Sequence, residues 1–339
     1  MNSTAQPQQE QPRIALLTTG LRPVPLAFAD FPGTPVGIIV WDHPAAFSSQ
    51  FSEILRVIRS RISSRPFASL RDLCEKQKLK YAECDKQHPE ALTALLEQWE
   101  IDLVVTSGCA IVSVDALSPA RFGAINLHPS RLPDWRGANP LFWQLANSEP
   151  LLGATVHVLS ERIDGGDIIA QAEVNKPVGM SRAELTQLLE GQIGVTLLKE
   201  SIERIAGGQL QSVRQNSSDT PYARTVSDEK LAEAIPLDSL QPETLWDLLN
   251  FYGYAPQQWI GISRWRQRLK WVATDWYSTE QIADAPANSA GWMLVEHNTH
   301  ITLKHKNGQI VLKPALFNSW RKPIVIQQPA MVKSRHVSR

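Results

Sequence analysis

The sequence has few cysteines, no net charge and no long hydrophobic run, and each of these absences argues against a class of protein. Its three cysteines show no CxxC spacing, which predicts neither a disulfide framework nor a structural zinc site. Lys+Arg and Asp+Glu both number 34, so the basic excess typical of a dedicated nucleic-acid binder is missing. No apolar run is long enough to cross a bilayer, and the polar, Gln-rich first twelve residues do not resemble a signal peptide. We therefore expect a cytoplasmic, globular protein with no metal and no membrane partner.

Several well-known site signatures are also missing. The loop after the first apolar segment, "TTGLRPVP", has one glycine, so the nucleotide-binding GxGxxG pattern is absent, and neither a Walker loop nor HExxH occurs. His128 and His157 are not accompanied by further ligand residues at metal-binding spacing. Ser107 and Ser130 lack the GxSxG elbow of a serine hydrolase. The chemistry must come from another arrangement.

Short apolar segments alternate with segments of helical spacing along the first half of the chain. The predicted strands are residues 13–19, 34–41, 101–108 and 125–130, and the predicted helices are residues 51–62, 67–79 and 89–100. This alternation predicts parallel βαβ units in an open, mainly parallel, twisted α/β sheet. In such a sheet the ligand crevice lies beyond the carboxyl ends of the strands.

The second half predicts two further strands, at 151–160 and 167–175, and a long helix over 181–208. Ser181 and Glu184 form a capping box that begins this helix, and Gly207-Gly208 ends it. From about residue 231 the chain becomes rich in tryptophan and in short alternating segments, and "KNG" at 306–308 predicts a hairpin turn. The predicted domains are a disordered tail (1–12), a catalytic domain (13–208), a linker (209–230), a smaller, mostly β C-terminal domain (231–325) and a basic tail (326–339).

The stretch "INLHPSRLPDWRG" places an amide and an imidazole two residues apart. Asn126 and His128 lie on one side of an extended chain, and Pro129 favours that extended geometry. Together they offer a fixed dipole and a protonatable donor, a pairing suited to a developing oxyanion. The alternative is a hydrogen-bonded histidine at a strand end beside an asparagine that caps backbone groups.

A second candidate stretch, "SERIDGGDIIAQ", places Asp164 before two glycines. Gly165 and Gly166 allow the loop to fold close over a ligand. A carboxylate at this position can favour a protonated imidazole and organise a water molecule. The alternative is an ordinary turn aspartate. Asp167 is a further candidate, but it leads directly into the next predicted strand.

Together, "INLHPSRLPDWRGANP" and "RIDGGDIIAQ" resemble the folate-dependent formyltransferases over about residues 13–207. That family carries an Asn-x-His pair, an "S-x-LP-x-(aromatic)-RG" loop and, at a similar interval, an aspartate before Thr/Gly-Gly. The resemblance implies a Rossmann-like formyltransferase fold and 10-formyltetrahydrofolate as formyl donor, with tetrahydrofolate as product. It also implies that Asn126 and protonated His128 stabilise the oxyanion. Asp164 would sustain the charge of His128 and help to pass a proton to the departing folate nitrogen.

The resemblance also implies where the donor binds. The pterin would lie between the loop at 106–112 and the loop at 159–166. The implied folate contacts are Ser107, Gly108, Cys109, Ala110, Ile111, Ile163, Gly165 and Gly166. The residues implied to shape the loop beside the site are Ser130, Leu132, Pro133, Arg136 and Gly137.

The stretch "WIGISRWRQRLKWVATDWY" bears on the amine acceptor. If it is a strand, one of its faces carries Arg264, Arg266, Arg268 and Lys270. Those cations either form a solvated face or contact phosphates of tRNA or of a nucleotide sugar. The basic, Gly-containing loop and the "R-I-D-W" segment typical of the tRNA enzymes are both missing.

We therefore predict an N-formyltransferase that acts on the primary amine of a small acceptor, with a nucleotide-linked amino sugar as first choice. A methionyl-tRNA formyltransferase is the main alternative. An amino acid or siderophore-precursor formyltransferase, a 10-formyltetrahydrofolate hydrolase and a non-catalytic folate-binding module also stay open. So does a homodimer.

Overall fold

The computed structural model describes residues 11–41, 66–216, 220–227, 230–257, 259–260, 271–278 and 291–315. The helix predicted at 51–62 lies outside these residues, as do the four cationic side chains. Those four are Arg264, Arg266, Arg268 and Lys270.

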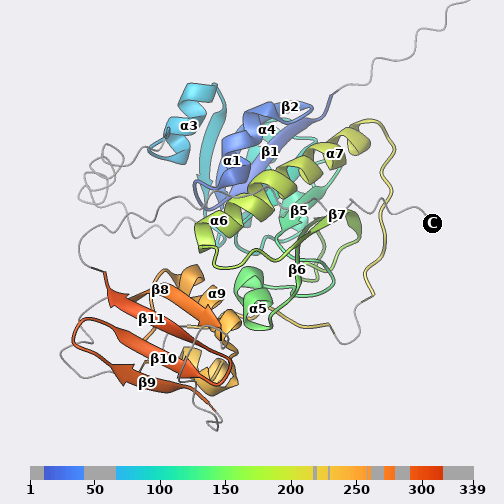
Figure 1. Cartoon of the computed structure of the whole chain (residues 1–339). Coiled ribbons are helices and arrows are strands. Elements are labelled where there is room, and N and C mark those ends of the chain that lie inside the picture. Colours follow the sequence, from blue (N-terminus) through green and yellow to red (C-terminus); the bar gives the residue numbers. More distant parts are fainter. Residues whose placement is uncertain are drawn as a thin grey trace, which may run out of the picture.

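A seven-stranded sheet forms the centre of the first domain (Figure 1). Its strands lie in the order β3-β2-β1-β4-β5-β6-β7. Their bounds are β1 (Arg13–Thr18), β2 (Thr34–Trp41), β3 (Lys80–Cys84), β4 (Leu103–Ser107), β5 (Ala124–His128), β6 (Leu151–Val158) and β7 (Ile168–Asn175). The first five strands pair in parallel, whereas β6 is antiparallel to both β5 and β7. The open, mainly parallel sheet predicted from the sequence is confirmed.

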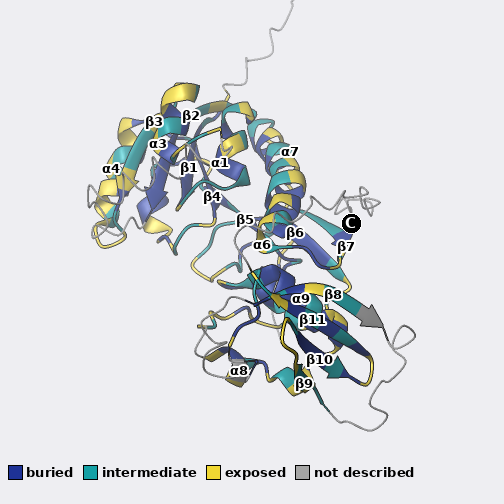
Figure 2. Ribbon diagram, turned by 60° about the vertical axis from the view of Figure 1, so that its left-hand side comes forward, coloured by how far each residue is buried: buried dark blue, intermediate teal, exposed yellow. Residues whose placement is uncertain are grey.

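Helices cover both faces of this sheet. They are α1 (Pro23–Ala27), α3 (Leu70–Gln77), α4 (Pro89–Gln98), α5 (Pro140–Ala146), α6 (Arg182–Thr186) and α7 (Val195–Ala206), with short 3-10 turns η1 (Phe28–Asp30) and η3 (Asp115–Leu117). Ile14 and Leu16 of β1 pack on the α1 and α7 side, and Ala15 and Leu17 pack on the α4 side. Figure 2 shows the resulting pattern, with buried strands between helices whose outer faces are exposed. Among the described helices, none has the length and apolar character needed to span a membrane.

The long helix predicted at 181–208 begins as expected, with the Ser181–Glu184 capping box in place. Its middle, η4 (Gln187–Gly194), is π-helical and joins α6 to α7 without a break. Gly194 lies so close to β5 that a Cβ there would be 2.5 Å from Leu127 Cδ2. The absence of a side chain at Gly194 therefore lets the helix pack directly against the strand that carries Asn126 and His128.

The edge strand β3 was missing from the sequence-based prediction. Its burial alternates weakly and only Cys84 is buried, so "KYAEC" lacks the apolar signal of a central strand.

The C-terminal domain is a four-stranded antiparallel sheet packed on one helix, which confirms the predicted smaller β domain. The strand order is β8-β11-β10-β9. Its elements are α8 (Leu231–Ala234), η6 (Leu237–Ser239), α9 (Pro242–Tyr252), β8 (Trp271–Ser278), β9 (Met293–Glu296), β10 (Ile301–His305) and β11 (Gly308–Pro314). The hairpin expected at "KNG" joins β10 to β11.

A buried ion pair and an aromatic contact join the two domains. Lys176, just after β7, pairs with Asp247 of α9, and both side chains are more than nine-tenths buried. The other Asp247 oxygen accepts the backbone N–H of Gly179 at 2.7 Å. Beside it, the rings of Phe142 (α5) and Phe251 (α9) lie 6.4 Å apart. α9 is therefore fixed to the catalytic domain.

We predict that Asp247→Ala lowers the free energy of unfolding by about 3 kcal/mol, because it leaves the buried Lys176 ammonium with only the exposed Glu243 carboxylate, 3.6 Å away. Asp275→Ala is the control, since the Asp275–Lys313 pair is exposed and 3.7 Å long, and it should cost below about 1 kcal/mol. Urea unfolding of both variants makes the comparison. Equal losses would show that the buried pair does not anchor α9.

Candidate active site

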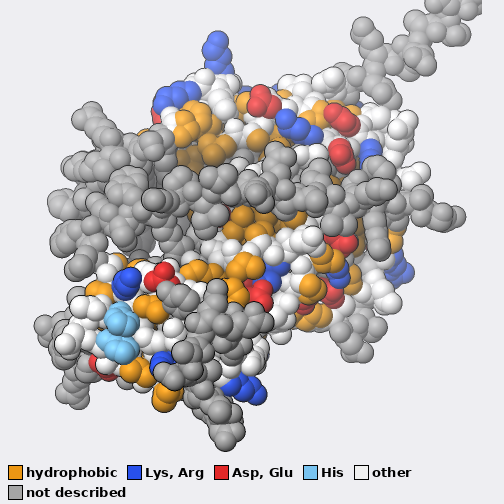
Figure 3. Space-filling model, viewed as in Figure 1, with side chains coloured by type: hydrophobic (Ala, Val, Ile, Leu, Met, Phe, Trp, Pro, Cys, Tyr) orange, Lys and Arg blue, Asp and Glu red, His pale blue; other side chains and the backbone are white. Residues whose placement is uncertain are grey.

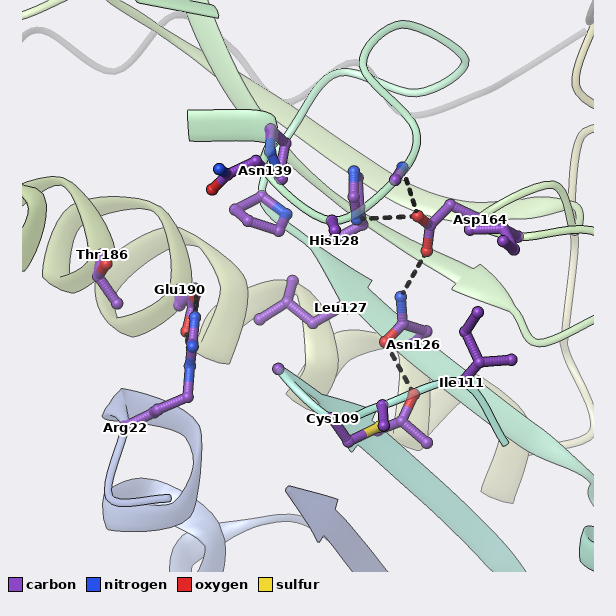
Figure 4. A pocket seen from close by; sticks show the side chains of 18 of the residues that line it. Arg22, Cys109, Ile111, Asn126, Leu127, His128, Asn139, Asp164, Thr186 and Glu190 are labelled. Atoms are coloured by element: carbon purple, nitrogen blue, oxygen red, sulfur yellow. Dashed lines mark hydrogen bonds and ion pairs between the residues drawn. The ribbon is translucent and has the colours of Figure 1, made fainter. Parts of the chain in front are cut away.

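A cavity of about 970 Å³ lies at the carboxyl ends of β4 and β5. The loops that follow these two strands line it, together with the loop before β7 and one side of α6 and η4. Figure 4 shows Asn126, His128 and Asp164 converging at its centre. The structure therefore brings together the three residues singled out in the sequence.

Asn126 is held in one orientation by its neighbours. Its Oδ1 accepts a hydrogen bond from Thr106 Oγ1 at 2.8 Å, so its Nδ2 is directed to the other side. There Nδ2 donates to Asp164 Oδ1 at 3.3 Å and lies 3.0 Å from His157 Nε2. A preorganised N–H donor thus lies at the end of β5.

His128 is buried, and each of its ring nitrogens faces a different group. Nε2 lies 2.9 Å from the backbone carbonyl of Trp135, which can only accept, so Nε2 carries a proton. Nδ1 lies 3.5 Å from Asp164 Oδ2. The nitrogen free to gain a proton therefore faces a carboxylate.

Trp135 presents its carbonyl to His128 from an unusual backbone conformation. Its φ of 61° is in the left-handed region, which a bulky side chain rarely adopts. Its backbone N–H donates to Pro221 at 2.8 Å, its indole N–H donates to Glu149 at 3.1 Å, and its ring stacks on Trp143. These contacts hold a strained residue in place, as is common beside functional groups.

Opposing effects set the charges of His128 and Asp164. Burial lowers the pKa of His128 below its ordinary value, while the nearby Asp164 carboxylate opposes that shift. Burial also acts to raise the pKa of Asp164, but His128, His157 and the Gly137 N–H together bring that pKa down to about 2. At neutral pH the cavity therefore contains an ionised carboxylate beside an imidazole that gives up its proton easily.

Asp164 is held by backbone groups as well as by side chains. Its φ is 48°, a left-handed conformation that aspartate tolerates better than most residues. Gly137 N donates to Asp164 Oδ2 at 2.8 Å. Gly137 itself has a φ of 111°, so the glycine of the "RG" pair is required by the backbone.

Gln215 locks the Asp164 loop to Arg136, and sequence reasoning did not identify it. Its Nε2 donates to the carbonyls of Asp164 (2.9 Å) and Gly166 (2.6 Å), and its Oε1 accepts from Arg136 Nε at 3.0 Å. Gln215 and Arg136 are both buried. Gln215 lies in the segment expected to be a linker, so no local pattern pointed to it.

His157 is a second residue of this cavity without a predicted role. It lies directly opposite Asn126 in the antiparallel β5–β6 pair, and its Nε2 is 3.6 Å from Asp164 Oδ1. The alternation in "ATVHV" indicated which face His157 occupies, but the pairing register with β5 could not be read from the sequence.

The residues implied to contact folate fall into two groups. Gly108, Cys109, Ala110, Ile111 and Ile163 line the cavity. Ile111 is 72% exposed and Ile163 43% exposed, which leaves an apolar rim open to a ligand. Burial raises the pKa of Cys109 to about 12, so its thiol is a poor nucleophile.

The remaining three implied contacts lie behind the cavity wall. Ser107 is buried and its hydroxyl has no hydrogen-bond partner. Gly165 and Gly166 follow Asp164 in its loop: Gly165 N donates to the Arg162 carbonyl at 2.9 Å, and the Gly166 carbonyl accepts from Gln215 at 2.6 Å. A Cβ at Gly166 would lie 1.8 Å from the carbonyl oxygen of Val158, so only glycine fits there.

Among the five predicted loop residues, Gly137 alone lines the cavity. Ser130 Oγ donates to the carbonyl of Asp134 at 2.7 Å, which tightens the loop. Leu132 is buried, Pro133 follows it, and Arg136 contacts Gln215. These four residues shape the loop. Among the described residues, no group of three or more His, Cys, Asp or Glu side chains could hold a metal ion.

Comparison with known protein families and curated proteins shows what the first domain is similar to. Residues 57–192 match the family model described as "Formyl transferase". The methionyl-tRNA formyltransferase of Clostridium acetobutylicum is 31% identical over 144 residues, which cover 42% of this chain and 46% of that protein. The chain thus matches about half the length of this curated relative.

Comparison with solved structures identifies the fold. WlaRD, a sugar 3N-formyl transferase solved with dTDP and 5-N-formyl-THF, aligns with a TM-score of 0.56 at 13% identity, covering 90% of this chain and 98% of that one. The N-formyltransferase of Helicobacter canadensis, solved with folinic acid and dTDP-3-aminofucose, gives 0.55 at 14% identity, covering 89% and 98%. The resemblance seen in the sequence is confirmed.

We predict that the pKa of His128 lies below the ordinary value for histidine because of burial, and lower still in the Asp164→Asn variant, because the carboxylate that favours its protonated form is then lost. Asp167→Asn is the control, since it removes a carboxylate three residues away in the same loop. A pH titration of the His128 ring resonances by NMR measures both. An unchanged midpoint in Asp164→Asn would contradict the coupling.

Proposed function

We propose that this chain, through its formyl transferase domain, transfers a formyl group from 10-formyltetrahydrofolate to the primary amine of a small acceptor. The observation that carries the proposal is the convergence of Asn126, His128 and Asp164 at the centre of one cavity. An amide donor and a proton carrier, each within 3.5 Å of one ionised carboxylate, are groups suited to acyl transfer to an amine.

Each of the three residues has a distinct role in this proposal. Asn126 Nδ2 turns the N–H that it gives to Asp164 Oδ1 at 3.3 Å toward the formyl oxygen as negative charge develops there, and it keeps its 3.0 Å contact with His157 Nε2. His128 takes the amine proton on Nδ1, Asp164 stabilises the resulting imidazolium across the 3.5 Å that separates them, and the imidazolium then gives that proton to the folate nitrogen. The proton that leaves the amine ends on the folate nitrogen as its bond to the formyl carbon breaks, which balances the transfer. The products are an N-formylated amine and tetrahydrofolate.

The lowered pKa of His128 suits this order of proton transfers. Burial lowers the pKa of His128 and so disfavours the imidazolium. Negative charge on the formyl oxygen would offset that burial and raise the pKa of His128 at the moment when it receives the proton. The stabilisation would then be larger in the transition state than in the ground state, which is the condition for catalysis.

The donor fits the part of the cavity around Gly108–Ile111 and Ile163. Those residues offer backbone groups and exposed apolar side chains to a flat, partly polar ring. The donor supplies the formyl group, and the amine attacks the carbon of that group.

For the acceptor, we favour a nucleotide-linked amino sugar. The enzymes with this fold include a sugar 3N-formyl transferase solved with dTDP, which supports that choice by analogy. In the view of Figure 3, acidic and basic side chains of the described residues are interspersed, without the continuous basic surface that tRNA would favour.

Methionyl-tRNA formyltransferase is the alternative, because the sequence relatives carry that name. The four cationic residues Arg264, Arg266, Arg268 and Lys270 would then contact RNA. That contact stays a prediction, since these residues lie outside the described part of the chain. An amino acid or siderophore-precursor acceptor, donor hydrolysis and a non-catalytic module are distinguished by the same experiment.

We predict that the chain releases tetrahydrofolate from 10-formyltetrahydrofolate when a small amine acceptor is present. The assay compares no acceptor, nucleotide-linked amino sugars, amino acids and charged initiator tRNA. His128→Asn should lower the rate by about 10²- to 10⁴-fold, the usual contribution of a general acid–base group, and leave donor binding intact. The matched control is His88→Asn, because His88 is exposed on another part of the domain.

The pattern of release decides between the functions. Release with tRNA alone would replace the small acceptor by tRNA. Steady release without any acceptor would indicate a hydrolase. Donor binding without release under every condition would contradict catalysis and indicate a binding module.

We also predict that Gln215→Met lowers kcat by about 10- to 100-fold, because the Asp164 loop loses its clamp and small displacements of a catalytic group are costly. Gln215→Glu keeps an acceptor for Arg136 but loses both donors to the loop carbonyls. Its thermal stability should therefore be closer to that of the wild-type chain than its kcat is. Steady-state kinetics and thermal unfolding of both variants separate these effects. A folded Gln215→Met variant with unchanged kcat would show that the clamp has no part in turnover.

A further inference from the structure

The cavity has two halves, and His128 and Leu127 lie between them (Figure 4). One half contains Cys109, Ile111 and Asp164, where the donor is proposed to bind. The other half contains Thr186 and Glu190, from the helix that starts at Arg182. A transfer between two substrates needs one on each side of the reacting groups, so the second half is left for the acceptor.

Arg182 is an unmatched cation in this second half. It lines the cavity, and none of the salt bridges among the described residues includes it. Two other arginines line the cavity: Arg22 pairs with the buried Glu190, and Arg162 lies beside Ile163 in the loop of Asp164, on the donor side. Arg182 is therefore the exposed, unpaired arginine that the helix side of the cavity offers among the described residues. Arg182 also occupies the first position of α6, where the helix dipole favours an anion and disfavours a cation. A charge placed against the local preference in this way is expected at functional sites.

An aromatic ring from the other domain holds this arginine. The Arg182 guanidinium carbon lies 5.6 Å from the centroid of the Phe251 ring, within the range of a cation–π contact. Phe251 also lines the cavity, although it belongs to α9 of the C-terminal domain. One turn earlier on α9, Asp247 forms the buried pair with Lys176, which fixes the position of the ring.

We propose that Arg182, supported by Phe251, forms a subsite for an oxyanion, a phosphate or a carboxylate, on the amine acceptor. The planar guanidinium binds such groups through two parallel hydrogen bonds. The C-terminal domain thus supplies part of the acceptor site. This assignment rests on the proposed function, because it takes the other half of the cavity as the donor site. Such a subsite selects acceptors that carry an anionic group over neutral amino sugars and simple alkylamines.

The test measures binding by calorimetry with the full chain and three probes. Thymidine diphosphate is the phosphate probe, succinate is the carboxylate probe, and 5-formyltetrahydrofolate reports on the donor half. Arg182→Gln should weaken binding of at least one anionic probe by about 10- to 100-fold, the usual value of a charge-assisted contact. Binding of 5-formyltetrahydrofolate should change less than about twofold, because Arg182 lies outside the donor half.

The chain offers a matched control. Arg224 lies 5.2 Å over the ring of Trp143, a contact of the same kind, but it does not line the cavity. Arg224→Gln should therefore leave all three affinities unchanged. Phe251→Leu keeps an apolar side chain at the domain interface and removes the π face, and it should weaken the anionic probe by about 3- to 10-fold.

Each of the following results would overturn the assignment. One is that neither anionic probe binds to the wild-type chain. Another is that Arg182→Gln and Arg224→Gln change the probe affinities equally. Weakened folate binding alone in Arg182→Gln would assign the cation to the donor instead. Failure of 5-formyltetrahydrofolate to bind would overturn the proposed function and the subsite with it, whereas intact folate binding without Arg182-dependent anion binding would overturn the subsite alone.

Discussion

The Asp164 carboxylate is the group on which the rest of the site depends. Removing an ionised carboxylate from water is costly unless it is paired and hydrogen-bonded. Its oxygens are contacted by Asn126, His128 and the Gly137 N–H, which come from β5 and the loop that follows it. Thr106 and the Trp135 carbonyl orient Asn126 and His128 from their other sides, so this largely buried charge is surrounded by groups already held in place. The need to satisfy the carboxylate explains why Asp164 accepts a left-handed backbone conformation.

Local patterns predicted the elements and residues that depend on local chemistry. Buried apolar segments indicated β1, β2 and β4, and the Ser181–Glu184 box located the start of the long helix. Asn126, His128 and Asp164 could be found because two short motifs carry them. His157 and Gln215 could not, since their roles depend on strand register and on contacts across 49 to 79 residues of sequence. The π-helical stretch depends on tertiary packing as well, and no composition rule marks it.

The two domains share one continuous hydrophobic core. The cluster that contains Leu127 of β5 also contains Leu248 of α9 and Leu303 of β10. The aromatic contact between α5 and α9 lies next to the cavity, because Phe251 takes part in both. At this junction the same side chain therefore packs the two domains together and lines the cavity.

The chain segment between the domains forms backbone hydrogen bonds with the loop that holds His128. Trp135 N donates to Pro221, Ala223 N donates to Arg136, and Asn139 N donates to Ala223, so residues 221–223 run beside the loop like an added strand. The boundary of the folding unit therefore differs from the boundary suggested by composition. An exchange of C-terminal domains between relatives would keep the first domain whole only if the junction followed Arg224. The point at which the two domains could be separated is therefore set by the backbone hydrogen bonds of residues 221–223, and not by the end of the long helix.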